Sequence, residues 1–145
     1  MDHFARIHAL FVLLDCAPIV GRRRLQKIAY LAGLPFRFEF GDRGPYSYEL
    51  DAVTDRLVGE GLIATEATPE GTTYRLTDRG RRFFARLTAD GYRFEPAEDV
   101  AALARLSPDR LEAMATLRFL IRRGLSEDEA RARLEMLRPG LKAVL

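Results

Sequence analysis

The 145-residue sequence contains no tryptophan and no asparagine, and only one cysteine and one glutamine. The lone cysteine, Cys16, excludes a disulfide framework and a cysteine-built zinc site. No uncharged run approaches the roughly 20 apolar residues of a membrane-spanning helix. The first residues also lack the basic and apolar regions of a signal peptide. These absences predict a cytoplasmic protein that does not enter a membrane.

Lysine is also scarce, because Lys27 and Lys142 are the only two lysines among 23 basic residues. The others are arginines, which bind phosphate and carboxylate groups through a planar, two-pronged guanidinium. Apolar residues make up 48% of the chain and charged residues 30%. This balance excludes a disordered or collagen-like chain and predicts one folded domain with a proper core.

Charge alternates in zones along the chain although the net charge is only +2. Residues 1–44 and 73–94 carry a basic excess, residues 45–72 carry six acidic side chains and one basic one, and residues 95–145 carry nine of each. A basic excess favours an anionic partner, whereas an acidic zone repels one.

The sequence provides no convincing catalytic or metal-binding set. A cysteine nucleophile needs a base within hydrogen-bond reach, but His8 lies about 12 Å from Cys16 along an ideal helix. The other histidine is His3, and two histidines without a cysteine ligand make a poor metal site. With no glycine-rich phosphate loop either, we expect a protein that is not an enzyme and that binds no cofactor and no metal.

The hydrophobic spacing predicts an α+β fold of the winged-helix type over residues 1–94. Its elements are three helices, a β-hairpin and a fourth helix, predicted over 2–16, 21–33, 47–61, 62–76 and from 77 onward, with a short strand over 36–40 and a turn over 41–45. We expect Phe36, Phe38 and Phe40 to join the core rather than to stack on bases. Residues 95–145 read as a helical extension of the same unit, which packs on the first part or forms a homodimer.

Basic and polar residues of the second and fourth helices form the candidate nucleic-acid surface. Arginines near a helix N-terminus suit phosphate contacts. The candidates are Arg22, Arg23, Gln26, Lys27, Tyr30, Tyr46, Ser47, Arg79 and Arg82. For the residues of the second helix, the alternative is an ordinary solvated helix face. For Arg79 and Arg82, the alternative is pairing with the acidic third helix.

The third helix, which reads the major groove in a winged-helix protein, has acidic outward positions. The candidate partner-binding residues there are Tyr48, Asp51, Asp55 and Arg56. Duplex DNA repels such a face, because DNA carries one negative charge per ~1.7 Å of its axis. This pattern favours either a basic protein partner or an internal match with the neighbouring arginines.

Two motifs resemble a known family. The segment GRRRLQKIAYL (residues 21–31) and the segment FGDRGPYSYEL (residues 40–50) resemble signatures of the YwgA-like family of small bacterial and archaeal proteins. Segments 111–120, 126–129 and 137–139 are similar to its C-terminal helices. A more distant resemblance is to the Panacea (SocA-type) antitoxin domain.

The resemblance implies a winged-helix-like fold without catalytic residues, and the Panacea likeness implies toxin neutralisation or delivery of a partner to a protease. Gln26, Lys27, Tyr46 and Ser47 are the polar positions of the two motifs. They either converge on one cleft or serve the fold, with Ser47 as a cap, Tyr46 as a packing residue, and Gln26 and Lys27 bound to a turn carbonyl. The sequence therefore predicts a binding protein, first a regulator on duplex DNA and alternatively an antitoxin- or adaptor-like protein-interaction module.

Overall fold

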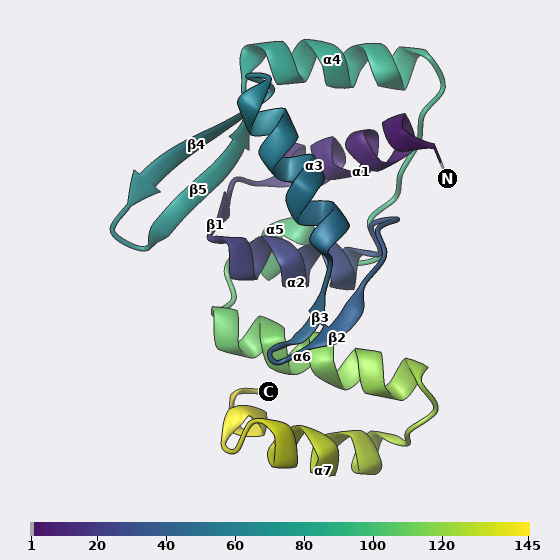
Figure 1. Cartoon of the computed structure of the whole chain (residues 1–145), viewed down its shortest axis with the longest axis vertical. Coiled ribbons are helices and arrows are strands. Elements are labelled where there is room, and N and C mark those ends of the chain that lie inside the picture. The colour runs from purple at the N-terminus through teal and green to yellow at the C-terminus, as the bar shows by residue number, and fades with distance from the viewer. Residues whose placement is uncertain (1) are drawn as a thin grey trace.

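The computed structural model describes residues 2–145 and has a mixed α+β architecture with two small antiparallel sheets (Figure 1). The helices are α1 (His3–Cys16), α2 (Arg22–Ala32), α3 (Tyr48–Gly59), α4 (Asp78–Ala89), α5 (Val100–Ala104), α6 (Pro108–Arg122), α7 (Glu127–Leu137) and the short 3₁₀ helix η1 (Leu141–Val144). The strands are β1 (Ile19–Val20), β2 (Glu39–Gly41), β3 (Gly44–Tyr46), β4 (Ile63–Thr68) and β5 (Gly71–Leu76). The predicted order of three helices, a hairpin and a fourth helix is confirmed.

The sheets depart from the prediction in their short strands. The first sheet has the order β1-β5-β4, and its strand β1 was not predicted, because two residues are too few to show an alternating pattern. The second sheet is the hairpin of β2 and β3. The strand predicted over residues 36–40 is wrong in its extent, since pairing begins at Glu39 and the turn narrows to Asp42 and Arg43.

Local capping chemistry fixes the helix ends where the sequence predicts them. The Ser47 hydroxyl accepts a hydrogen bond from the Leu50 N–H at 3.0 Å, which starts α3. Gly33 ends α2 in the left-handed conformation, with φ 81°. Ser126 and Glu129 form a capping box at the start of α7, where each side chain accepts the backbone N–H of the other residue.

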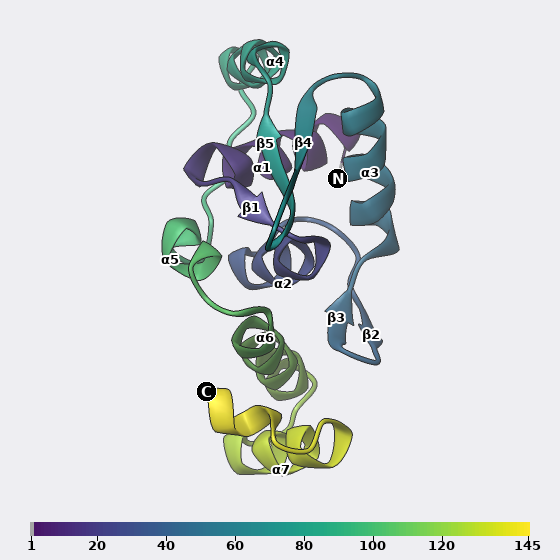
Figure 2. The same cartoon turned by 90° about the vertical axis from the view of Figure 1, so that its left-hand side faces the viewer.

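Helix α2 lies in the middle of the molecule (Figures 1 and 2). Helix α1 and the first sheet lie on one side of it, and α6 and then α7 on the other, while α5 and α3 lie on opposite flanks in the turned view. The main core contains side chains from α1 to α6, and a smaller cluster of Ala113, Leu134 and Leu141 joins α6, α7 and η1. Helices α5 and α6 therefore pack on the first part of the chain, and α7 and η1 pack on α6.

One prediction about aromatic side chains needs correction. Phe40 was expected in the core but is 41% exposed, although Phe36 is buried and Phe38 half-buried as expected. Phe40 still packs one face against Phe119, with 5.2 Å between ring centroids. Within residues 2–145, no helix combines the length and the apolar character needed to cross a bilayer.

Candidate functional site

Two polar side chains of α2, those of Gln26 and Lys27, face β3 and the start of α3 rather than solvent. The Gln26 amide is fully buried, and its Nε2 donates to the Ser47 carbonyl at 2.8 Å and to Asp51 Oδ1 at 2.9 Å. Its Oε1 accepts the Ser47 N–H at 2.8 Å. Gln26 therefore fastens the first turn of α3 to α2.

Arg22 pairs with both acidic residues of α3. Its guanidinium lies 2.7 Å from Asp51 Oδ1 and 2.8 Å from Asp55 Oδ1, and its Nε donates to the Tyr74 hydroxyl. The Tyr46 hydroxyl also donates to Asp51. Burial alone raises the pKa of the Asp51 carboxyl, but the hydrogen bonds from Tyr46, Arg22 and Gln26 outweigh it and lower that pKa overall. Asp51 is therefore held as an ion inside this network.

A second network joins α2 to the C-terminal helices. Arg23 lies 3.1 Å from Asp109 and 3.2 Å from Glu112, both on α6. Glu112 is only 1% exposed and also accepts a hydrogen bond from Arg138, which follows α7. The buried carboxylate thus ties α2, α6 and the end of α7 together.

Lys27 lies between these two networks. It is 4% exposed, and its ammonium donates to the Pro45 carbonyl at 2.7 Å and lies 5.9 Å from the centre of the Tyr46 ring. Burial lowers the pKa of Lys27 to about 8; the nearby Glu112 raises it, whereas Arg23 and Arg43 lower it further. A substantial fraction of this buried amine is therefore neutral in mildly alkaline solution.

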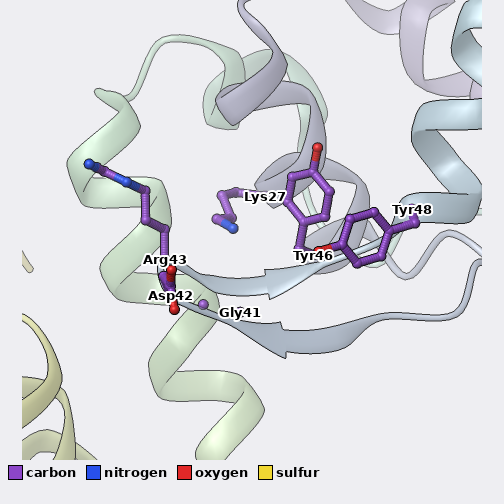
Figure 3. Close-up of a pocket in the computed structure, with 7 residues that line it drawn as sticks. Lys27, Gly41, Asp42, Arg43, Tyr46 and Tyr48 are labelled. Carbon is purple, nitrogen blue, oxygen red and sulfur yellow. The ribbon is translucent and has the colours of Figure 1, made fainter.

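Two adjoining hollows open beside Lys27. One of about 390 Å³ is bounded by Lys27, Gly41, Asp42, Arg43, Gly44, Tyr46 and Tyr48. The other, of about 270 Å³, is bounded by Arg22, Arg23, Gln26, Lys27, Arg43 and Tyr46. Since Lys27, Arg43 and Tyr46 border both, we call the two together the Lys27 cleft. Figure 3 shows Arg43 and Tyr46 on either side of Lys27.

The β2–β3 hairpin holds one wall of the Lys27 cleft against α6. Gly44 adopts φ +90°, and a Cβ placed there would lie 2.2 Å from Thr116 Oγ1. A side chain at this position would therefore push the hairpin away from α6, so a glycine is required both for the conformation and for the close approach.

The candidate nucleic-acid residues of α2 and β3 do not form a solvent-facing row. Gln26, Lys27, Tyr30 and Ser47 are buried, and the alternative that Ser47 caps a helix while Gln26 and Lys27 bind turn carbonyls is confirmed. Their proposed contact with phosphate does not fit this burial. Tyr30 packs its ring against Phe38, with centroids 5.2 Å apart.

The remaining candidates lie in three places. Arg22 and Arg23 are partly accessible but paired with carboxylates, and Tyr46 is half-buried in the Lys27 cleft. Arg79 and Arg82 are exposed on α4, where Arg79 donates to the Glu60 carbonyl at 2.9 Å. The structure therefore does not bring the α4 arginines to the α2 residues.

The acidic face of α3 is also largely matched from within. Asp51 and Asp55 share Arg22, which is the internal alternative left open above, and Arg56 lies 2.8 Å from Glu60. Tyr48 is different, because it is 72% exposed at the start of the helix and its side chain makes no ion pair or hydrogen bond within residues 2–145. Of the four candidate partner-binding residues, Tyr48 is therefore the one that is both exposed and unpaired.

Sequence reasoning missed Glu112 and Arg43. Glu112 stands among Leu111, Ala113 and Ala115 in an otherwise apolar stretch of α6, and that isolation was a readable sign of a buried, paired carboxylate. Arg43 lies in a turn, and its place beside Lys27 depends on the folding of the hairpin, so the sequence carried no signal for it.

The described residues contain no group of three or more histidine, cysteine, aspartate or glutamate side chains arranged to hold a metal. Comparison with models of known protein families and with curated proteins finds no match. The resemblance to the YwgA-like and Panacea families therefore stays a prediction.

Proposed function

We propose that this chain is a non-enzymatic protein-binding module built on a winged-helix domain. The order α1-β1-α2-α3-β4-β5 and the sheet order β1-β5-β4 support the winged-helix interpretation. The β2–β3 hairpin is then an insertion before the third helix, where it borders the Lys27 cleft. The proposal places the binding surface at this insertion.

The observation that carries the proposal is the exposed aromatic side chain of Tyr48 beside that cleft. Tyr48 is 72% exposed and borders both the 390 Å³ hollow and a further hollow of about 260 Å³. Phe40 is 41% exposed on β2, and Arg43 lies in the turn that follows it. Tyrosine, phenylalanine and arginine are the residue types enriched at protein interfaces and at their energetic centres.

Electrostatics favour a protein over duplex DNA at this face. Arg22 and Arg23 are each shared between two carboxylates, so they bring little net positive charge to the surface. The outward side of α3 retains Asp55, whose side chain is 68% exposed. A phosphate backbone approaching α3 would meet this carboxylate first.

The test compares captured proteins between matched variants. We expect a specific protein to be retained by the wild-type chain and by Met136→Ala, and to be lost with Tyr48→Ala. Met136 is the control because it is 78% exposed on α7 and borders none of the hollows beside Lys27 and Tyr48. Quantitative mass spectrometry of material bound to the immobilised chain provides the measurement. Equal capture by Tyr48→Ala and the wild type refutes the proposal.

A second candidate function is nucleic-acid binding through α4. Arg82 and Arg86 are exposed there, and within residues 2–145 neither takes part in a hydrogen bond or an ion pair of its side chain. Fluorescence anisotropy of duplex DNA over a salt series tests it, with Arg82→Gln/Arg86→Gln against Arg133→Gln. A loss of binding confined to the α4 variant, with a salt slope of about −0.9 per phosphate, supports DNA binding. The absence of binding at low salt excludes it.

A further inference from the structure

We propose that the Lys27 cleft holds a carboxylate of an acidic peptide segment, with the Lys27 ammonium as its anchor and Arg43 as its second contact. This inference rests on the proposed protein-binding function and assigns the chemistry of the partner. It concerns the inner part of the cleft, whereas the proposed function rests on the exposed ring of Tyr48.

The Lys27 ammonium has fewer acceptors than donors. An ammonium carries three N–H groups, and within residues 2–145 the Pro45 carbonyl is the one acceptor that its Nζ contacts at hydrogen-bond distance. With Lys27 only 4% exposed, the remaining donors gain little from solvent, and buried donors without partners cost free energy. A bound carboxylate supplies both the missing acceptors and the opposite charge.

The charges that border the cleft favour an anion. Its walls contain four cationic side chains, Arg22, Arg23, Lys27 and Arg43, and one carboxylate, Asp42. Carboxylates of α3 and α6 pair with Arg22 and Arg23 and offset their charge, so Lys27 and Arg43 carry the unpaired positive charge of the cleft. Arg43 is exposed and makes no ion pair within residues 2–145, so its guanidinium is available to a ligand.

The shape of the cleft favours a peptide over a nucleic-acid backbone. The larger hollow, of about 390 Å³, lies in the range of small-ligand sites, and with the adjoining hollow of about 270 Å³ it leaves room for a short extended segment. Lys27 is only 4% exposed, so a ligand must enter the cleft to reach its Nζ, and a carboxylate on a flexible side chain does so more readily than a phosphate held in the rigid backbone of a duplex. The rings of Tyr46 and Tyr48 add apolar walls that pack against the stems of peptide side chains.

The test uses fluorescence anisotropy with two labelled peptides, one of six glutamates and one of six glutamines. We expect the wild-type chain to bind the glutamate peptide and not the glutamine peptide. Lys27→Met is expected to weaken binding at least about tenfold, because it removes a charge-assisted contact. The matched control is Lys142→Met, since Lys142 is the chain's other lysine and is exposed on η1. It is expected to bind like the wild type.

A second variant covers the case in which Lys27→Met does not fold. Arg43 is exposed in a turn, so Arg43→Gln leaves the core untouched and is expected to weaken binding about three- to tenfold. Binding is also expected to fall as the pH rises through 8, where Lys27 loses its proton, and this decline should be absent in a folded Lys27→Met.

Three results would overturn the inference. These are equal binding of both peptides, wild-type affinity in both Lys27→Met and Arg43→Gln, or displacement of the peptide by inorganic phosphate at concentrations far below those needed with acetate. The first two remove the carboxylate anchor, and the third makes the cleft a phosphate site. If the glutamate peptide fails while Tyr48→Ala still loses the captured protein, the carboxylate assignment falls and the proposed function stands.

Discussion

Raising the pH from 8 to 10 should stabilise this protein through Lys27. The ordinary pKa of a lysine is 10.5, and burial lowers that of Lys27 to about 8 in the folded chain. Between these values the unfolded chain binds more protons than the folded one, so the free energy of unfolding increases with pH. At about 1.36 kcal/mol per pH unit, the whole interval is worth at most about 3 kcal/mol. Most of it, about 2 kcal/mol, falls between pH 8 and 10.

Two other groups, Cys16 and Tyr46, change the free energy of unfolding in the opposite direction as the pH rises, so the experiment has to exclude their contribution. Burial raises the pKa of the Cys16 thiol, and burial together with Asp51 raises the pKa of Tyr46 to about 12. Each of these groups lowers stability as the pH rises, because the unfolded chain releases its proton first. A Cys16→Ser background removes the thiol, and a pH limit of 10 avoids most of the effect of Tyr46.

Urea unfolding followed by circular dichroism at pH 7, 8, 9 and 10 measures the effect. In the Cys16→Ser background, stability is expected to rise with Lys27 present and to stay flat or fall in Lys27→Met. The difference between the two proteins isolates the lysine, since every other titrating group is common to both. Parallel pH profiles would refute the conclusion that a charged amine is buried at this position.

Three further substitutions test the networks and the packing by urea unfolding. Gln26→Leu should destabilise the chain by about 1–3 kcal/mol, because it leaves the buried Ser47 N–H without a partner and removes one of the two donors to the Ser47 carbonyl; a loss under about 1 kcal/mol would show that water replaces the amide. Gly80→Ala should cost at least about 1–3 kcal/mol, since its Cβ would lie 2.1 Å from a backbone carbonyl oxygen, whereas Gly59→Ala, with open space around it, should be neutral or stabilising. Equal effects at the two glycines would contradict this difference in packing. Glu112→Gln should cost about 1–3 kcal/mol and loosen the C-terminal helices, because Arg23 and Arg138 lose the negative charge that they share. Unchanged protease sensitivity of those helices would contradict this role of Glu112.

Features that depend on a few adjacent residues were predictable from the sequence. The helix starts at Ser47 and Ser126 follow from side-chain capping, and the end of α2 at Gly33 follows from its left-handed conformation. The hairpin of β4 and β5 was predictable because two short strands flank a turn.

Features that depend on distant partners were not predictable. Strand β1 exists because Ile19 pairs with Tyr74. A strand of two residues is too short to show the alternation of apolar and polar side chains that predicts a strand. The polar positions of α2 show the usual pattern of a solvated helix face, yet that face meets β3 and α3 instead. Helical periodicity states which residues share a face, but the neighbour of that face is decided by tertiary packing. The buried state of Gln26 and Lys27 therefore had to come from the structure.

The contrast between Gln26 and Lys27 explains why the second residue is the centre of the proposed site. Each binds a carbonyl at the β3–α3 junction, but the Gln26 amide also accepts the Ser47 N–H and donates to Asp51, so all its main polar contacts are made within the chain. A neutral amide at position 27 would satisfy the Pro45 carbonyl equally well without burying a charge. The ammonium adds a charge and spare donors that the fold does not use, and both face a cleft bordered by further cations. The residue that lowers stability below pH 8 is thus the one that an acidic ligand would stabilise most.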